Sequence, residues 1–176
     1  MNGEWIGTRH LVVACRPAEV LPNLFPEIPY NPARVVALGY RKSELGEPFY
    51  GFGFLVPKVE RRGISAVTWV PNKFDYRAPD DKVLLRCFTT GARADVHDEL
   101  REKLAITAKP LFEQETSWQH AMPQYEVGHA VKVAIIEEML ADFPGLHLAG
   151  NAYNGVGIPD CIRMGKKVAE QIASQP

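Results

Sequence analysis

The sequence lacks several features that mark whole classes of protein. It has three cysteines among 176 residues, and Cys15, Cys87 and Cys161 stand far apart, outside any C-x-x-C pair. This scarcity argues against a disulfide framework and favours reduced thiols in a cytoplasmic protein. No apolar run approaches the ~18 residues of a membrane span, and the first residues lack a basic segment followed by an apolar one. We therefore expect neither a transmembrane helix nor a secretory signal.

An excess of one charge is also missing. The chain has 20 Lys and Arg residues against 21 Asp and Glu residues, a net charge of −1. Nucleic-acid binding needs a clustered basic face, so we expect no nucleic-acid partner. Apolar residues make up 46% of the chain, which is enough to bury a substantial core.

Several motifs that carry chemistry are absent too. No G-x-G-x-x-G follows a strand, and there is neither a phosphate-binding P-loop nor an H-E-x-x-H pair. The five histidines do not cluster at metal-ligand spacing, so no metal site is expected. The serines and cysteines have no evident His or Asp partners, so the sequence pattern alone assigns no catalytic residue.

The hydrophobic pattern predicts an α+β fold with a mostly antiparallel sheet. The period of apolar residues changes from two to near 3.6 after Gly91. The expected strands cover 11–14, 33–40, 51–56, 64–70, 82–88, 116–125 and 146–149, and the expected helices cover 17–24, 95–109, 128–142 and 159–173. The last helix is expected to direct Ile162, Ala169 and Ile172 inward.

The most informative segment is Leu146–Ile162, which reads as a short apolar strand, a glycine-rich loop and a helix that starts at Pro159. Such a junction gathers backbone N–H groups and the positive end of a helix at one point, where an anionic or electron-rich cofactor is stabilised. The same pattern is typical of an ordinary tight turn between a strand and a helix. On the pattern alone, the turn is the better interpretation.

Four blocks of sequence, in order, change that balance. They are Leu11-Val-Val-Ala with Pro17-Ala18; Val35-Val-Ala-Leu-Gly-Tyr40 leading to Gly51-Phe-Gly-Phe-Leu-Val-Pro57; Trp118-x-x-Ala-Met-Pro-Gln-Tyr-x-x-Gly-His129; and Leu148-Ala-Gly-Asn-Ala-Tyr-x-Gly-Val-Gly-Ile-Pro-Asp-Cys-Ile162. Together they resemble the flavin-dependent protoporphyrinogen oxidases, over nearly the whole chain. The resemblance is to the C-terminal portion of that family only, because the family's dinucleotide fingerprint and its membrane-facing helical region lie upstream of these blocks.

The resemblance implies the C-terminal part of an FAD-dependent protoporphyrinogen or coproporphyrinogen oxidase of haem biosynthesis. It divides the chain into a partial FAD-domain strand and connection (1–30), a substrate-binding domain (31–125) and a return to the FAD domain (126–176). It implies a truncated product, a split product or a designed fragment, which is inactive alone and holds only half of an FAD site. The implied partners are a porphyrinogen and either a separate N-terminal half or a second copy, with peripheral membrane association of the full enzyme.

The resemblance also implies site residues. Those implied to contact FAD are Trp118, Asn151, Val156, Gly157, Ile158 and Pro159. Those implied to line the porphyrinogen pocket are Phe52, Leu55, Thr68 and Phe88. Without the resemblance, Trp118 and the alternating strand residues are better read as ordinary core.

Two other interpretations stay open. One is a different flavin amine oxidase-like enzyme, such as a carotenoid desaturase relative, although the blocks at Gly51–Pro57 and Trp118–His129 argue against it. The other is a non-catalytic remnant or binding module that retains the sheet and has lost the flavin.

Overall fold

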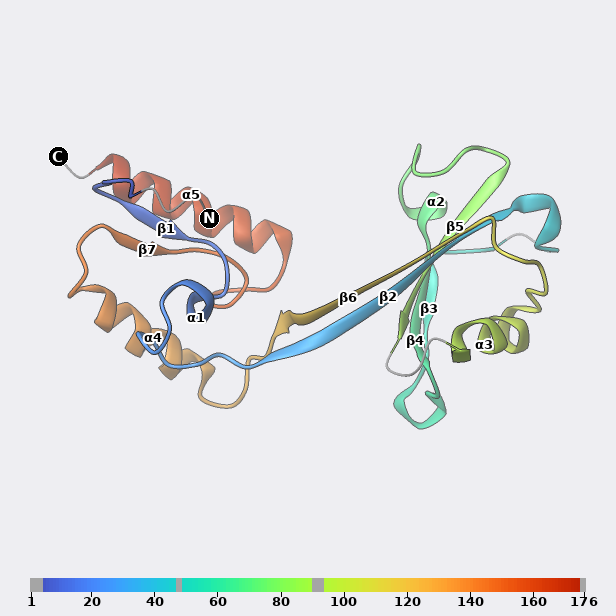
Figure 1. Cartoon of the computed structure of the whole chain (residues 1–176), viewed down its shortest axis with the longest axis horizontal. Helices are drawn as coiled ribbons and strands as arrows, with labels where there is room; N and C mark the ends of the chain where they lie inside the picture. Colours follow the sequence, from blue (N-terminus) through green and yellow to red (C-terminus); the bar gives the residue numbers. More distant parts are fainter. Residues whose placement is uncertain (1–4, 47–48, 90–93, 175–176) are drawn as a thin grey trace. The chain divides into compact units, whose positions relative to one another are not determined.

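The chain forms two compact units in a computed structural model that describes residues 5–46, 49–89 and 94–174. Unit 1 comprises residues 1–31 and 122–176, and unit 2 comprises residues 32–121. The chain passes from unit 1 to unit 2 within one long strand, β2 (Tyr30–Arg41), and returns within another, β6 (Phe112–Pro123) (Figure 1). Each unit has its own cluster of buried apolar side chains.

Unit 2 is built on a five-stranded sheet with the strand order β3-β4-β5-β2-β6. β3 pairs with β4, β4 with β5 and β5 with β2, all in antiparallel register. The elements between β2 and β6 are η1 (Lys42–Glu44), β3 (Gly53–Leu55), η2 (Lys58–Glu60), β4 (Ile64–Trp69), α2 (Val70–Lys73), β5 (Lys82–Thr89) and α3 (Ala94–Leu104). The predicted α+β class with a mostly antiparallel sheet is confirmed.

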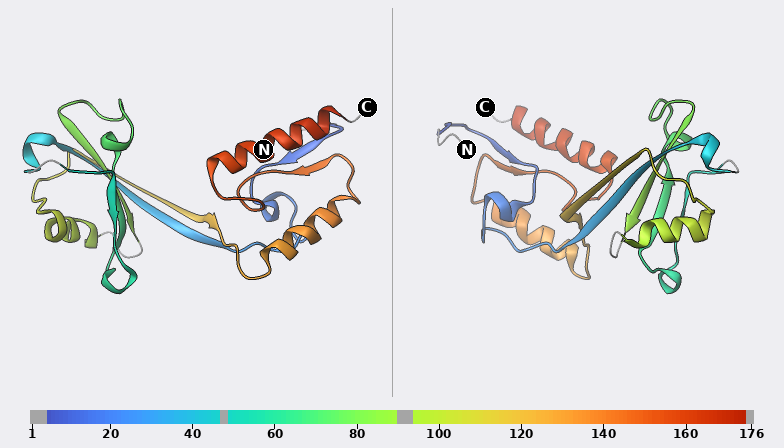
Figure 2. Two further views of the ribbon diagram at one scale, coloured as in Figure 1. Left: turned by 180° about the vertical axis from the view of Figure 1, so that it is seen from behind. Right: turned by 45° about the vertical axis from the view of Figure 1, so that its right-hand side comes forward.

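One face of this sheet is covered by α3, as both views in Figure 2 show. Val96 and Leu100 of α3 are buried in one cluster with Leu38, Val67 and Leu85 of the sheet. Side chains alternate along a strand, so the residues between these point to the other side of the sheet. We call that side the open face. Its side chains are half-buried or exposed, and Leu55 is 81% exposed.

A β-bulge in β4 decides which side chains reach the open face. Ile64 lies opposite Thr89 and Ala66 lies opposite Phe88, so the extra residue is Ser65, whose hydroxyl donates to the Phe88 carbonyl oxygen over 3.1 Å. Because a bulge shifts the alternation by one residue, Ile64 and Val67 both point into the core. Thr68 therefore points to the open face.

Position 53, in the second sequence block, requires a glycine for steric reasons. It starts β3 with φ 145°, and a Cβ at this position would overlap the carbonyl oxygen of Val67 on β4. Only glycine allows that backbone conformation and that close approach of two strands. The Gly-Phe-Gly part of the block therefore has a structural role in pairing β3 with β4.

The helix α3 ends earlier than predicted. It stops at Leu104, whereas the sequence favoured an end at Lys109 before Pro110. The next residue, Ala105, has φ 53°, and the Ile106 N–H donates to the Leu100 carbonyl oxygen over 3.4 Å. Left-handed backbone directly after the last helical residue is a common way for a helix to end, here without the usual glycine.

Unit 1 contains a short parallel sheet and three helices. Its elements are β1 (Leu11–Val13), α1 (Pro17–Val20), α4 (His129–Leu140), β7 (Leu146–Leu148) and α5 (Ile158–Ala173). β1 and β7 pair in parallel, with Val13 beside Leu148. The predicted inward face of α5 is wrong in part, because Ile162 is 66% exposed and the buried residue of the helix is Val168. Unit 1 thus leaves apolar helix surface outside its own core.

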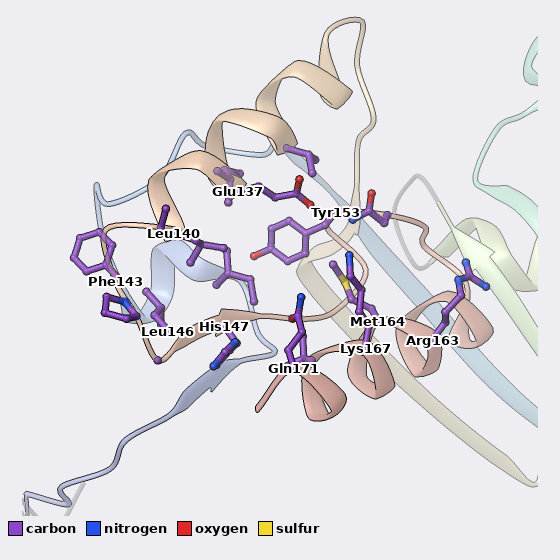
Figure 3. Close-up of a pocket in the computed structure, with 18 of the residues that line it drawn as sticks. Glu137, Leu140, Phe143, Leu146, His147, Tyr153, Arg163, Met164, Lys167 and Gln171 are labelled. Atoms are coloured by element: carbon purple, nitrogen blue, oxygen red, sulfur yellow. The ribbon is translucent and has the colours of Figure 1, made fainter. Parts of the chain in front are cut away.

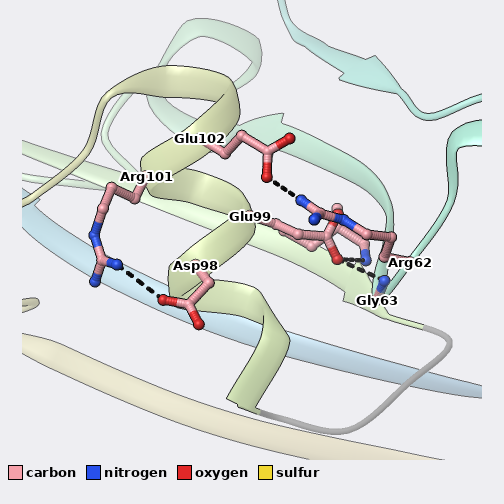
Figure 4. Close-up of polar contacts among 7 residues, drawn as sticks. Arg62, Gly63, Asp98, Glu99, Arg101 and Glu102 are labelled. Carbon is pink, nitrogen blue, oxygen red and sulfur yellow. Dashed lines mark hydrogen bonds and ion pairs between the residues drawn. The ribbon is translucent and has the colours of Figure 1, made fainter.

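A buried carboxylate connects α3 to the start of β4. Glu99 is 2% exposed, and its Oε1 accepts hydrogen bonds from the N–H groups of Gly63 and Ile64, at 2.5 and 2.9 Å (Figure 4). Its Oε2 has no hydrogen-bond partner among the described residues. One turn further along α3, Glu102 pairs with Arg62 while both side chains remain exposed.

Glu99→Ala is expected to destabilise unit 2 strongly. It removes the carboxylate oxygen that accepts from two buried backbone N–H groups, at about 1–3 kcal/mol each. The control Glu102→Ala removes only an exposed ion pair on the same helix and should change little. Urea unfolding followed by tryptophan fluorescence tests this, because Trp69 lies in the unit 2 core. Equal effects of the two substitutions would contradict the role given to Glu99.

Candidate functional site

The glycine loop that the sequence singles out connects β7 to α5 in unit 1. Asn151 is half-buried, and Ala152 and Tyr153 are buried, whereas Val156 and Ile158 are 45% and 78% exposed. The first half of the loop is therefore packed into unit 1, and the second half presents side chains to the surface. The residues expected to contact a flavin between Asn151 and Pro159 lie together on this one loop.

Two side chains from the third sequence block support the backbone of this loop. The Tyr125 hydroxyl donates to the Asn151 carbonyl oxygen over 2.8 Å and accepts from the Gly155 N–H over 2.9 Å. The His129 Nε2 donates to the Tyr153 carbonyl oxygen over 3.0 Å. The two rings stack with their centroids 3.8 Å apart. Together the two rings hold three successive parts of the loop in place.

The start of α5 carries its own carboxylate. The Gly157 N–H donates to Oδ2 of Asp160 over 3.2 Å, and Asp160 also pairs with Arg163 on the next turn. This carboxylate offsets part of the positive end of the helix dipole. The expected cluster of bare N–H groups is therefore smaller than the sequence indicates, because the N–H groups of Gly155 and Gly157 already have acceptors.

The second half of the loop keeps backbone donors that are available to a ligand. Within the described part of the chain, the N–H groups of Val156 and Ile158 have no protein acceptor. Pro159 follows at the first turn of the helix and has no N–H of its own. An exposed pair of N–H groups flanked by apolar side chains can bind the carbonyl edge of a flat heteroaromatic ring.

The other expected site residues belong to unit 2. Leu55, Thr68 and Phe88 lie close together on the open face, because Leu55 is opposite Ala66 and Ala66 is opposite Phe88. Phe52 precedes β3 and is 63% exposed. Trp118 lies on β6 and is 49% exposed, so it is not part of the unit 2 core. Trp118 and the glycine loop thus belong to different units.

Unit 1 also contains a groove of about 840 Å³ between α4 and α5, over β7 (Figure 3). Its apolar lining includes Val133, Ile136, Leu148, Met164 and Val168. Tyr153 projects into it, as Figure 3 shows, and burial raises the pKa of the Tyr153 hydroxyl above its ordinary value. That hydroxyl has no hydrogen-bond partner among the described residues.

Neither a metal centre nor a membrane span is found in the described segments. Across residues 5–46, 49–89 and 94–174, no three or more His, Cys, Asp or Glu side chains gather closely enough to hold a metal ion. Over the same ranges, no helix has both the length and the apolar character to cross a bilayer.

Tyr125, His129 and Asp160 were not expected as site residues. All three lie inside the sequence blocks that carry the family resemblance, so the signal was present. The roles of Tyr125 and His129 depend on hydrogen bonds to backbone atoms 24–30 residues away in the chain. No local pattern reveals such bonds.

Tyr125→Phe is expected to loosen the glycine loop while it retains the stack on His129. Removing the hydroxyl leaves the Gly155 N–H without its acceptor, at a net cost of about 1 kcal/mol per hydrogen bond. Amide hydrogen exchange at Gly155 should therefore accelerate roughly three- to tenfold. The control Tyr76→Phe changes a hydroxyl on a side chain that is 92% exposed. Unchanged exchange at Gly155 would mean that the hydroxyl does not hold the loop.

Gly155→Ala is expected to disrupt the loop, in contrast to Gly165→Ala. Gly155 has φ 127°, and a Cβ there would overlap the Asp160 carboxyl group. Strained backbone of this kind costs about 1–3 kcal/mol before the overlap is counted. Gly165 lies inside α5 with open space around it, so alanine there should stabilise the helix by about 0.5–1 kcal/mol. Thermal unfolding followed by circular dichroism measures both; a neutral Gly155→Ala would overturn this assignment.

Comparison with known proteins finds porphyrinogen oxidases among the relatives of this chain. The chain is 33% identical over 145 residues to coproporphyrinogen III oxidase of Bacillus subtilis (strain 168), an alignment that covers 74% of this chain and 31% of that protein. It spans about a third of the length of the curated relatives it matches. No protein-family model matches the chain.

Comparison with solved structures also finds a protoporphyrinogen oxidase. A crystal structure assigned as a protoporphyrinogen oxidase from Exiguobacterium sp. 255-15 superposes with a TM-score of 0.77 and 26% identity, over 93% of this chain and 40% of that one. Reduced UDP-galactopyranose mutase superposes with a TM-score of 0.61 at 13% identity, which shows a shared fold only. Over most of its length, the chain is therefore related to the protoporphyrinogen and coproporphyrinogen oxidases, and it corresponds to the C-terminal portion of such enzymes.

Proposed function

We propose that the chain is the C-terminal part of an FAD-dependent oxidase that acts on a porphyrinogen. The observation that carries this proposal is the glycine loop of unit 1. Its first half is anchored by Tyr125 and His129, and its second half presents the free N–H groups of Val156 and Ile158. The similarity to coproporphyrinogen III oxidase of B. subtilis supports the assignment to porphyrinogen chemistry rather than to another flavin enzyme.

The proposal assigns a different task to each unit. Unit 1 is proposed to contribute to the FAD-binding domain, for which we propose residues 1–30 and 126–176. Unit 2 is the substrate-binding part, for which we propose residues 31–125. The parallel pairing of β1 with β7 supports the first assignment, because short parallel strands belong to larger α/β sheets.

The residues that would hold FAD are those of the loop and the start of α5. We propose that Asn151 lies beside the ribityl and pyrophosphate part, and that Val156, Gly157, Ile158 and Pro159 lie against the flavin ring. When bound, FAD would supply the acceptor for the hydride removed from the substrate, and oxygen or another acceptor would restore it. The chain itself would position the ring through backbone donors.

The open face of unit 2 suits a large, flat and apolar substrate. Leu55 and Phe88 present apolar surface there, and Thr68, which lies opposite Gly53 and Arg86 in the neighbouring row, adds a polar group. We propose that these residues and Phe52 contact the porphyrinogen macrocycle. Few polar groups are needed at such a surface, since the macrocycle is bound mainly by apolar contact.

A further polypeptide segment is proposed to complete unit 1. Valines and isoleucines are exposed on α4 and at the start of α5, among them Val131 at 64% and Ile162 at 66%. The groove between these helices has apolar and charged side chains in its lining and contains the unpartnered hydroxyl of Tyr153. Parallel sheets are normally buried on both faces, but the sheet of unit 1 has two strands among the residues that the structure describes. The relatives are about three times longer, so we propose that the remainder of such a protein covers this surface.

The chain alone is expected to bind FAD weakly. In the proposed enzyme the adenine half of FAD is held by the G-x-G-x-x-G segment, and this sequence has none. Titration of the purified chain with FAD, followed by flavin fluorescence, should give a weak signal. Adding the N-terminal half of a related oxidase should produce a stable flavin complex. Co-purification of stoichiometric flavin with the chain alone would contradict the half-site.

Gly157→Val tests whether the loop contacts the flavin in that complex. A side chain at this position would lie where the ring is proposed to bind, so flavin retention should be lost. A Cβ at Gly157 would also approach Oδ2 of Asp160 to 3.0 Å, which confounds the single variant. The same substitution in an Asp160→Ala background removes that contact. Recovery of flavin binding in the double variant would mean that the glycine serves only the helix cap.

A further inference from the structure

The centre of the open face carries a cationic side chain. Arg86 on β5 lies directly opposite Thr68 on β4 and opposite Ala37 on β2. Paired residues of antiparallel strands point to the same side of a sheet, so Arg86 and Thr68 are neighbours on the open face. Phe88, two residues along β5, lies on the same side, with its ring centroid 5.7 Å from Cζ of Arg86.

Arg86 differs from the other cations on this face. Arg41 and Lys82, by alternation, lie at the end of the same face, and each pairs with a carboxylate, Glu44 at 3.2 Å and Asp81 at 3.1 Å. Within the described ranges of the chain, Arg86 has neither a hydrogen bond nor an ion pair to a carboxylate. Its Nε is buried and unpartnered, and so is the Thr68 hydroxyl oxygen.

Two unpartnered polar groups at the middle of an apolar face need an explanation. Buried donors and acceptors in folded proteins almost always have partners, because an unmade hydrogen bond costs stability. A guanidinium and a hydroxyl on adjacent strands together match one ligand chemistry, a carboxylate. The guanidinium donates from two nitrogens in a planar fork, and the hydroxyl donates to the same group.

We propose that Arg86 and Thr68 bind a propionate carboxylate of the substrate. This inference rests on the proposed function, and it favours a substrate with carboxylates on several sides, such as the tetracarboxylic coproporphyrinogen. Phe88 and Leu55 would contact the macrocycle beside that carboxylate. Arg86 would be a binding residue rather than a catalytic one, because a propionate lies away from the carbon that loses hydride.

The test uses the full chain and two stable porphyrin probes, coproporphyrin III and its tetramethyl ester, in the same dilute non-ionic detergent. The ester keeps the macrocycle and removes all four negative charges. Binding is followed by quenching of tryptophan fluorescence. Arg86→Gln is expected to weaken binding of the acid about tenfold or more and to leave the ester unchanged. Thr68→Val, which keeps the shape of the side chain, should weaken binding of the acid a few-fold.

Two further variants make the result specific. Arg86→Lys keeps the charge and loses the planar fork, so it should recover only part of the affinity for the acid. Arg77→Gln is the matched control, because Arg77 also lies over an aromatic ring, that of Phe74 at 5.5 Å, and is exposed elsewhere in unit 2. It should bind both probes as the parent does. Circular dichroism and thermal unfolding confirm that each variant is folded.

The possible outcomes separate a failure of the role given to Arg86 from a failure of the proposed function. An Arg86→Gln variant that loses the acid and the ester equally would show that Arg86 only packs beside Phe88, and the inference would fail while the proposed function stands. The same holds for a variant that binds both probes as the parent does. A parent chain that binds neither probe would contradict the proposed substrate face itself, and this inference with it.

Discussion

The hydroxyl of Tyr125 is the contact on which the glycine loop depends. It bonds to the carbonyl oxygen of Asn151 and to the N–H of Gly155, so one atom fixes the backbone on both sides of Tyr153. His129 holds Tyr153 itself. A loop with this many glycines loses much entropy when it is ordered, and side-chain bonds from outside the loop offset that loss. Side chains of the third sequence block therefore stabilise the loop that the fourth block forms.

The bulge at Ser65 has a comparable role in unit 2. It lets Ile64 and Val67 both enter the core, and thereby turns Thr68 toward Arg86 and away from α3. Without the extra residue, one end of β4 would direct polar side chains into the core or apolar ones out of it. A local irregularity in one strand thus sorts the residues of the sheet into a packed face and a face that is free to bind.

The sequence predicted much of this fold because its strands and helices are strongly periodic. Every expected β-run from Ala33 to Phe88 is a strand, and the three longer helices lie where expected. The errors have physical causes. The end of α3 was missed because Ala105 adopts left-handed backbone, which composition does not signal. The inward face of α5 was misjudged because Ile162 is apolar yet lies outside the core of unit 1.

The candidate site was predictable only in outline. A family resemblance points to positions, whereas the roles of Tyr125, Asp160 and Arg86 follow from strand register and from hydrogen bonds across the chain, which no short pattern encodes.

The glycines of the loop show how such positions must be interpreted. A Gly-x-Gly before a helix is expected both where a cofactor approaches the backbone and where the backbone simply needs glycine. Here Gly155 has a conformational and steric reason of its own, and the N–H of Gly157 is capped by Asp160. Neither glycine is therefore evidence for a flavin by itself. The donors that remain for a cofactor include the N–H groups of Val156 and Ile158, held at the surface by a loop whose other half is fixed. Backbone donors of this kind orient a ring without any side-chain chemistry, so the contribution of unit 1 to the reaction would be position, and selectivity would be left to the side chains of unit 2.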